Sequence, residues 1–223
     1  MAIIDQAAGV EYDLYKVRLR SATEIAFRYG GTVALNGDGR SGGAIAAEWG
    51  LLVGIIREQE LASGSINHAL SMTVLCSSGQ PGVYPSRGGS GTACNDPKRG
   101  VGIDPTDAPA IGMQFQLVMT DQEINDLPVP NWKKTILRAM AHYGMFVGDT
   151  GGGTAWGIQL ESGVTYTSFG YEDRLWLFGE SNGFEEYTPD GSTLTTLVAR
   201  LAGDVTWASR LRVIDPCVSA GTC

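Results

Sequence analysis

The chain is short of basic residues and has no long apolar run. Of its 223 residues, 16 are Lys or Arg, only four of these are Lys, and the formal net charge is −8. Because Lys and Arg form no stripe or cluster, the sequence argues against a nucleic-acid partner. No segment reaches the roughly 18 consecutive apolar residues that a membrane-spanning helix needs, so we expect no association with a membrane.

Several chemical motifs are also missing. The two histidines exclude a three-histidine zinc site, and the absence of a CxxC pair argues against a cysteine-based one. There is no GxSxG motif, and the glycines at 151–153 lack the Lys-Ser/Thr of a phosphate-binding loop. We therefore expect no cofactor and no metal. A structural calcium ion is the one exception, since the carboxylates of "GIDPTDAP" (102–109) could hold it.

What is present indicates one packed, β-rich domain. Hydrophobic residues make up 43% and charged residues 18%, which is typical of a globular protein. The 31 glycines favour short strands joined by turns. No repeat, linker or change of composition divides residues 1–223, so a single domain is expected. We predict a jelly-roll-like β-sandwich with three or four short helices, with an α+β fold around one antiparallel sheet as the alternative.

Local patterns place the expected elements. Alternation of apolar and polar residues predicts strands, and apolar residues three or four apart predict helices. Strands are expected at 10–20, 66–76, 111–119, 154–162, 164–170, 173–179 and 205–215, with a strand or hairpin within 24–43. Helices are expected at 57–64, from 121 onward, at 131–143 and at 192–203. Thr120 and Glu123 have the spacing of a capping box, and Gly144 is a natural helix stop.

The four cysteines predict two local disulfides. Cys76 and Cys94 flank a Gly/Ser/Pro-rich segment, and Cys217 and Cys223 bracket the last turn of the chain. Each bond would stabilise a loose segment by a few kcal/mol. Disulfides favour an extracellular protein. The first residues show no signal-peptide features, so we expect either a protein that is not secreted or a mature or shortened form with an added Met, and the cysteines favour the second.

Asp149 is the first candidate for chemistry. It ends a short apolar run, "MFVGD", and is followed by Thr and three glycines. One interpretation is a functional carboxylate at a sheet end, with glycines that let a ligand approach closely. The other is an Asp that caps its own turn. "DTG" is also the aspartic-protease signature, but a single copy would require a dimer.

Glu11, Asp13 and His68 complete the expected catalytic group. Glu11 and Asp13 lie two residues apart on one strand face, about 6.6 Å between Cα atoms, which suits a glycosidase carboxylate pair. The alternative is an exposed strand end. His68 shares the face of Leu70 and would act as a base or orienting group, or else as a core histidine bonded to a backbone carbonyl.

Several segments together resemble a family of secreted bacterial proteins associated with polysaccharide. They are Arg57 and Glu60 followed by "GSINHAL" (64–70), "VYPSR" (83–87), "DP…AP…GMQFQL" (104–117) and "ILRAMAHYGMFVGDTGG" (136–152). The resemblance covers about residues 50–155. It implies secretion and a β-rich fold, and it points to His68, Glu60, Arg57 and Asp149 as site positions. From the spacing alone, Arg57 and Glu60 form an ordinary pair within a helix.

These observations predict a secreted carbohydrate-active enzyme. We expect a glycoside hydrolase that acts on an extracellular polysaccharide or oligosaccharide, ahead of a polysaccharide lyase. The alternative is a non-catalytic carbohydrate-binding or cell-surface module. Trp49, Trp156 and Trp176 are the candidate sugar-stacking aromatics, with core packing favoured for Trp156. The expected substrate-binding residues are Trp49, Glu48, Arg57 and Tyr84.

Overall fold

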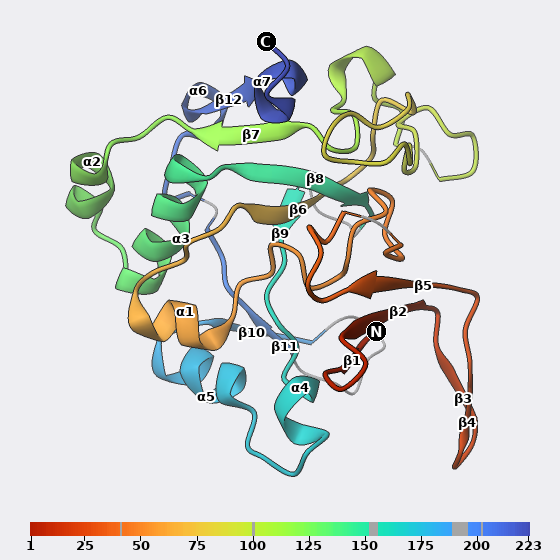
Figure 1. Ribbon diagram of the computed structural model, residues 1–223. Helices are drawn as coiled ribbons and strands as arrows, with labels where there is room; N and C mark the ends of the chain where they lie inside the picture. Colours follow the sequence, from red (N-terminus) through yellow and green to blue (C-terminus); the bar gives the residue numbers. More distant parts are fainter. Residues whose placement is uncertain (41, 100, 152–155, 189–195, 202) are drawn as a thin grey trace.

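The computed structural model describes residues 1–40, 42–99, 101–151, 156–188, 196–201 and 203–223. Its centre is a five-stranded sheet in the order β12-β7-β8-β6-β9. Strands β6 and β8 run parallel, and the other neighbours are antiparallel. The bounds are β6 Leu70–Val74, β7 Gln114–Leu117, β8 Met145–Thr150, β9 Trp156–Ile158 and β12 Leu211–Ile214. Figure 1 shows this sheet in the upper half of the view, with β12 and β7 nearest the top.

The longest helix supplies much of the core. Helix α3 (Asn131–His142) has buried residues at three- and four-residue spacing, among them Trp132, Ile136 and Met140. They pack with β6 and β8 in one continuous apolar cluster. Gly144 follows the helix with φ +77°, a conformation that side chains other than glycine's rarely adopt. Burial of this stripe fixes the helix beside the sheet.

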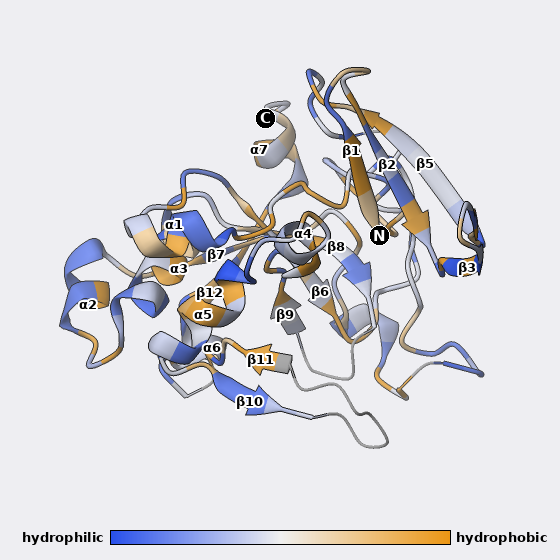
Figure 2. Cartoon of the chain, turned by 90° about the horizontal axis from the view of Figure 1, so that it is seen from below, coloured by the Kyte–Doolittle hydropathy of each residue, from blue (hydrophilic) through white to orange (hydrophobic). Residues whose placement is uncertain are grey.

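A second, three-stranded antiparallel sheet is formed by the N-terminal region. Its order is β1-β2-β5, with β1 Ala2–Asp5, β2 Val10–Tyr15 and β5 Tyr29–Ala34. The strand expected at 10–20 breaks at Lys16, which has φ +53°. Beyond the break, β3 (Arg18–Ser21) and β4 (Glu24–Ala26) form a separate hairpin that projects from the body (Figures 1 and 2).

The remaining elements are short. The helices are α1 Glu58–Ser63, α2 Asp121–Asp126, α4 Val164–Thr167, α5 Arg174–Ser181, α6 Trp207–Arg210 and α7 Pro216–Ala220, with a 3-10 turn at Pro105–Asp107. Strands β10 (Glu185–Tyr187) and β11 (Thr196–Val198) form a two-stranded antiparallel sheet. Within the described ranges, no helix has both the length and the apolar character needed to cross a membrane.

The disulfides are those predicted. Cys76 bonds Cys94, and Cys217 bonds Cys223. Cys94 is fully buried, so the first bond secures the 77–93 segment from inside. Both bonds fit an extracellular protein.

Helix and strand contents are similar, which is consistent with the α+β alternative, whereas a jelly roll is not confirmed. Two expected strands are wrong: residues 164–167 and 174–181 form α4 and α5. Asp173 decides the second case, because its side chain accepts from Trp176 N at 2.9 Å and caps a helix. Of the expected helix at 192–203, residues 192–195 and 202 lie outside the described part, and 196–198 are strand.

Candidate functional site

The Glu11 and Asp13 carboxylates are enclosed by the protein. Both side chains lie on the inner face of β2, where Glu11 is only 3% exposed and Asp13 is 0% exposed. Asp13 Oδ2 accepts from Leu51 N at 2.9 Å, and Glu11 Oε1 accepts from Leu52 N at 3.1 Å. Gly50 passes so close that an added Cβ would lie 2.9 Å from Glu11 Oε2. The pair therefore holds segment 45–52 against the N-terminal sheet, with no access for a substrate in this structure.

The geometry favours a protonated Glu11 beside Asp13. Burial, followed by the hydrogen bond and the charge of Asp13, raises the pKa of Glu11 from 4.5 to about 7. Asp13 Oδ1 is buried, and no described residue donates to it. A protonated Glu11 supplies the missing donor, because a hydrogen bond between two carboxyl groups requires one proton.

Asp149 lies at the other end of the same segment. It is the fifth residue of β8, half-buried, and its carboxylate accepts from the backbone N–H groups of Thr150 and Ala46. Burial raises the pKa of Asp149, and these two bonds oppose the rise. Just before it, an added Cβ on Gly148 would lie 2.8 Å from Trp49 Cζ2. Asp149, Glu11 and Asp13 therefore hold two ends of one loop.

His68 is separated from Asp149 by the length of a strand. Asp149 pairs with Thr73 near the end of β6, whereas His68 lies in a bend before the first residue of that strand, Leu70. The histidine Nε2 lies 2.9 Å from Glu60 Oε1, and Nδ1 lies 2.9 Å from Ala69 O. Glu60 also accepts from Arg57 N at 2.8 Å, which caps α1. His68, Glu60 and Arg57 thus form one cluster that ties α1 to the start of β6.

The predicted substrate-binding residues do not share one surface hollow. Trp49 is 2% exposed, so protein covers both of its faces. Glu48, directly before Trp49, has a left-handed backbone conformation with φ +65°. Tyr84 is 38% exposed and stacks under Arg40, whose guanidinium carbon lies 4.3 Å from the ring centroid.

The loop predictions have mixed outcomes. Gly151 has φ +110° and open space around its Cβ position, while Gly152 and Gly153 lie outside the described residues. In the 102–109 segment, Asp104 accepts from the backbone and hydroxyl of Thr106, so it caps the 3-10 turn. The described residues contain no group of three or more His, Cys, Asp or Glu arranged for a metal ion.

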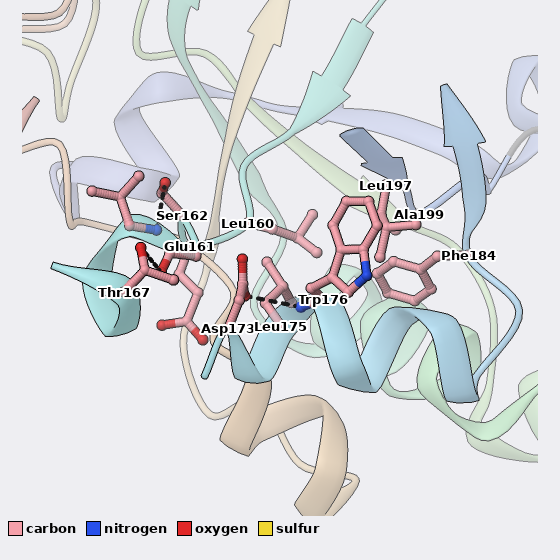
Figure 3. A pocket seen from close by; sticks show the side chains of 12 residues that line it. Leu160, Glu161, Ser162, Thr167, Asp173, Leu175, Trp176, Phe184, Leu197 and Ala199 are labelled. Atoms are coloured by element: carbon pink, nitrogen blue, oxygen red, sulfur yellow. Dashed lines mark hydrogen bonds between the residues drawn. The ribbon is translucent and has the colours of Figure 1, made fainter. Parts of the chain in front are cut away.

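A different place in the fold provides a cavity. A hollow of about 370 Å³ lies between the connection after β9, helices α4 and α5, residue 184 and strand β11. Its volume lies within the range of about 300–1,000 Å³ that is typical of small-molecule sites. Figure 3 shows aromatic and aliphatic side chains gathered at one end and polar side chains at the other.

The apolar end is built around Trp176 and Phe184. It is lined by Leu160, Leu175, Trp176, Phe184, Leu197 and Ala199. Phe184 is buried, and its ring centroid lies 4.7 Å from that of Trp132 and 6.0 Å from that of Phe178. Trp132 is in turn fixed by a 3.0 Å hydrogen bond from its Nε1 to Asn182 O. Trp176 is half-buried, so part of its indole remains available to a ligand.

The polar end carries two carboxylates, Glu161 and Asp173. Glu161 Oε1 accepts from Glu58 N at 2.6 Å and from the Tyr166 hydroxyl at 2.9 Å. Burial, and after it the hydrogen bond and charge of the Glu161 carboxylate, raises the pKa of Tyr166 to about 12. Asp173 uses Oδ1 to cap α5, and Gly163 lies so close to Oδ2 that no side chain would fit there. The backbone of Glu161 is held by Ile56, which accepts from Glu161 N at 2.8 Å.

Trp176 was a candidate sugar-stacking residue, but the other cavity residues were missed because their local pattern imitates strands. "VTYTSFG" and "DRLWLFG" alternate in polarity, so both were interpreted as short strands, in which successive side chains lie on opposite faces. The available signal was Asp173, a preferred N-cap residue directly before "RLW". A helix starting there places Trp176 within one turn of Asp173, so both face the same hollow.

Comparisons with known proteins add no assignment. No family model matches the chain, and neither the curated proteins nor the solved structures include a significant match. The resemblance to secreted, polysaccharide-associated proteins therefore stays a prediction.

Proposed function

We propose that this protein is a secreted carbohydrate-binding module whose ligand occupies the cavity at Trp176. The observation that carries the proposal is the pairing, in one hollow, of an aromatic end with a carboxylate end. Sugars present apolar C–H faces that stack on aromatic rings and hydroxyl groups that donate to carboxylates. We place binding ahead of hydrolysis because the predicted catalytic pair, Glu11 and Asp13, is buried and accepts hydrogen bonds from the backbone of the 45–52 segment.

Glycoside hydrolysis is the second candidate. Glu161 and Asp173 line the same cavity, and glycosidases use two carboxyl groups on opposite sides of the bond that breaks. Such an enzyme would release reducing ends from a polysaccharide, and Asp173→Asn would abolish the release. A pure binding module would release none.

Affinity electrophoresis on a panel of neutral, acidic and basic polysaccharides tests both candidates. We expect retardation of the wild type in at least one gel, and loss of that retardation in Trp176→Ala. Trp207→Ala is the matched control, because Trp207 is also half-buried but packs on Trp156, with ring centroids 5.1 Å apart, outside the cavity lining. Retardation that survives Trp176→Ala would place the sugar site elsewhere.

A further inference from the structure

The charges around the cavity narrow the class of ligand. Glu161 and Asp173 are the charged residues of its lining, and no Lys or Arg belongs to the lining among the described residues. Glu58 and Arg174 lie close enough to act on the Tyr166 hydroxyl, and Arg174 is exposed at the rim. The acids Glu58, Glu161 and Asp173 outnumber the exposed Arg174, so this end of the cavity is negatively charged. The whole chain is also negative. An anionic sugar would be repelled.

One oxygen of each cavity carboxylate accepts no hydrogen bond from the described residues, and that oxygen of Asp173, Oδ2, lies against Gly163 on one side. Both donors to Glu161 reach Oε1, and none of the described residues donates to Oε2. The helix cap uses Oδ1 of Asp173. In Figure 3 the Asp173 carboxylate lies between the Glu161 side and the Trp176 ring. An ionised carboxylate accepts hydrogen bonds only, so the ligand group placed here must be a donor.

We infer that the ligand is a cationic, unacetylated amino sugar, such as a unit of a glucosamine oligomer, with its ammonium group between Glu161 and Asp173 and its C–H face on Trp176. This inference rests on the proposed function. A ligand that covers two carboxylates removes water from them, which is costly unless an opposite charge compensates. An ammonium group supplies that charge and three donors, and neighbouring aromatic faces attract cations. An N-acetyl group offers one donor and no charge.

Titration calorimetry at mildly acidic pH, where the amines are protonated, tests the inference. The ligands are glucosamine, N-acetylglucosamine and galacturonate oligomers of equal length. We expect the glucosamine oligomer to bind about tenfold or more tightly than the N-acetylated one, and its affinity to fall as NaCl is added. The galacturonate oligomer should not bind measurably.

The matched variant is Glu161→Gln/Asp173→Asn. Each amide oxygen can still accept the hydrogen bonds that Glu58 N, Tyr166 and Trp176 N donate, so the fold is kept while both charges are removed. We expect this variant to lose about tenfold in affinity for the glucosamine oligomer and little for the N-acetylated one. Asp5→Asn/Glu24→Gln removes two charges outside the cavity lining and should change neither affinity.

The outcomes separate the two claims. Equal or tighter binding of the N-acetylated oligomer, or glucosamine binding that salt and the charge-removing variant leave unchanged, would overturn the amino-sugar inference and leave carbohydrate binding standing. Failure of the wild type to bind any of the three oligomers would overturn the amino-sugar inference, and the proposed function falls with it only if no polysaccharide of the electrophoresis panel retards the protein. Measurement of the salt dependence on the wild type keeps the test decisive if the double variant does not fold.

Discussion

The buried Glu11–Asp13 pair makes stability depend on pH in an unusual direction. Burial and the neighbouring Asp13 raise the pKa of Glu11 from 4.5 to about 7 in the folded chain. The folded state therefore holds its proton more tightly than the unfolded state, so the pair stabilises the fold below pH 4.5 and loses this contribution as pH rises through about 7. Each unit corresponds to about 1.36 kcal/mol, so the loss is about 3 kcal/mol.

Glu11→Gln is the perturbation that isolates this effect. A glutamine can accept from Leu52 N and donate to Asp13 Oδ1, as a protonated glutamate does, but it does not ionise. Urea unfolding in buffers from about pH 4.5 to 8.5 should show wild-type stability falling with pH and the variant nearly level. Above pH 7 the variant should be the more stable protein.

The controls address the other acids. Glu24→Gln removes an exposed acid and should keep the wild-type pH profile. Burial also raises the pKa of Asp149, so a small residual slope of the same sign is expected in Glu11→Gln and should vanish on adding Asp149→Asn. Equal slopes for the wild type and Glu11→Gln, or a wild type that gains stability with pH in this window, would refute the claim that folding raises the pKa of Glu11.

Two further predictions concern packing and the disulfides. Gly148→Ala would place a Cβ 2.8 Å from Trp49 Cζ2, so it should lower the free energy of unfolding by about 1–3 kcal/mol in urea denaturation. Gly157→Ala, whose nearest atom would be 3.6 Å away, is the control and should change little. Reduction of the Cys76–Cys94 bond, which closes 18 residues of sequence, should cost about 3 kcal/mol and open the enclosed segment to protease. Unchanged cleavage after reduction would mean that the segment is ordered without the bond.

The sequence contains enough information for elements whose local signals agree with their packing. Helix α3 combines an apolar stripe with a following glycine, and α2 begins with a complete capping box, so both were predicted. The pairing of the cysteines followed from the segments that they enclose. Glu11 and Asp13 do share one strand face, as predicted, and both are buried there, although the strand ends at Tyr15.

What the sequence could not supply is the three-dimensional neighbourhood of each acid. That the backbone of segment 45–52 binds Glu11, Asp13 and Asp149 depends on contacts between distant parts of the chain. Likewise, the parallel pairing of β6 with β8 decides that His68 and Asp149 lie at different ends of the strands. The cavity forms only where α5, residue 184 and β11 come together in three dimensions. The alternation of apolar and polar residues in the 164–179 region predicted strands there instead of helices.

The most direct test of the carbohydrate site is to follow the five tryptophan indole N–H signals by nuclear magnetic resonance during titration with a glucosamine oligomer. Trp176→Phe assigns the signal that belongs to the cavity. The account predicts a progressive shift of the Trp176 signal, while the enclosed Trp49 stays in place. A shift of Trp49 with Trp176 unmoved would contradict it.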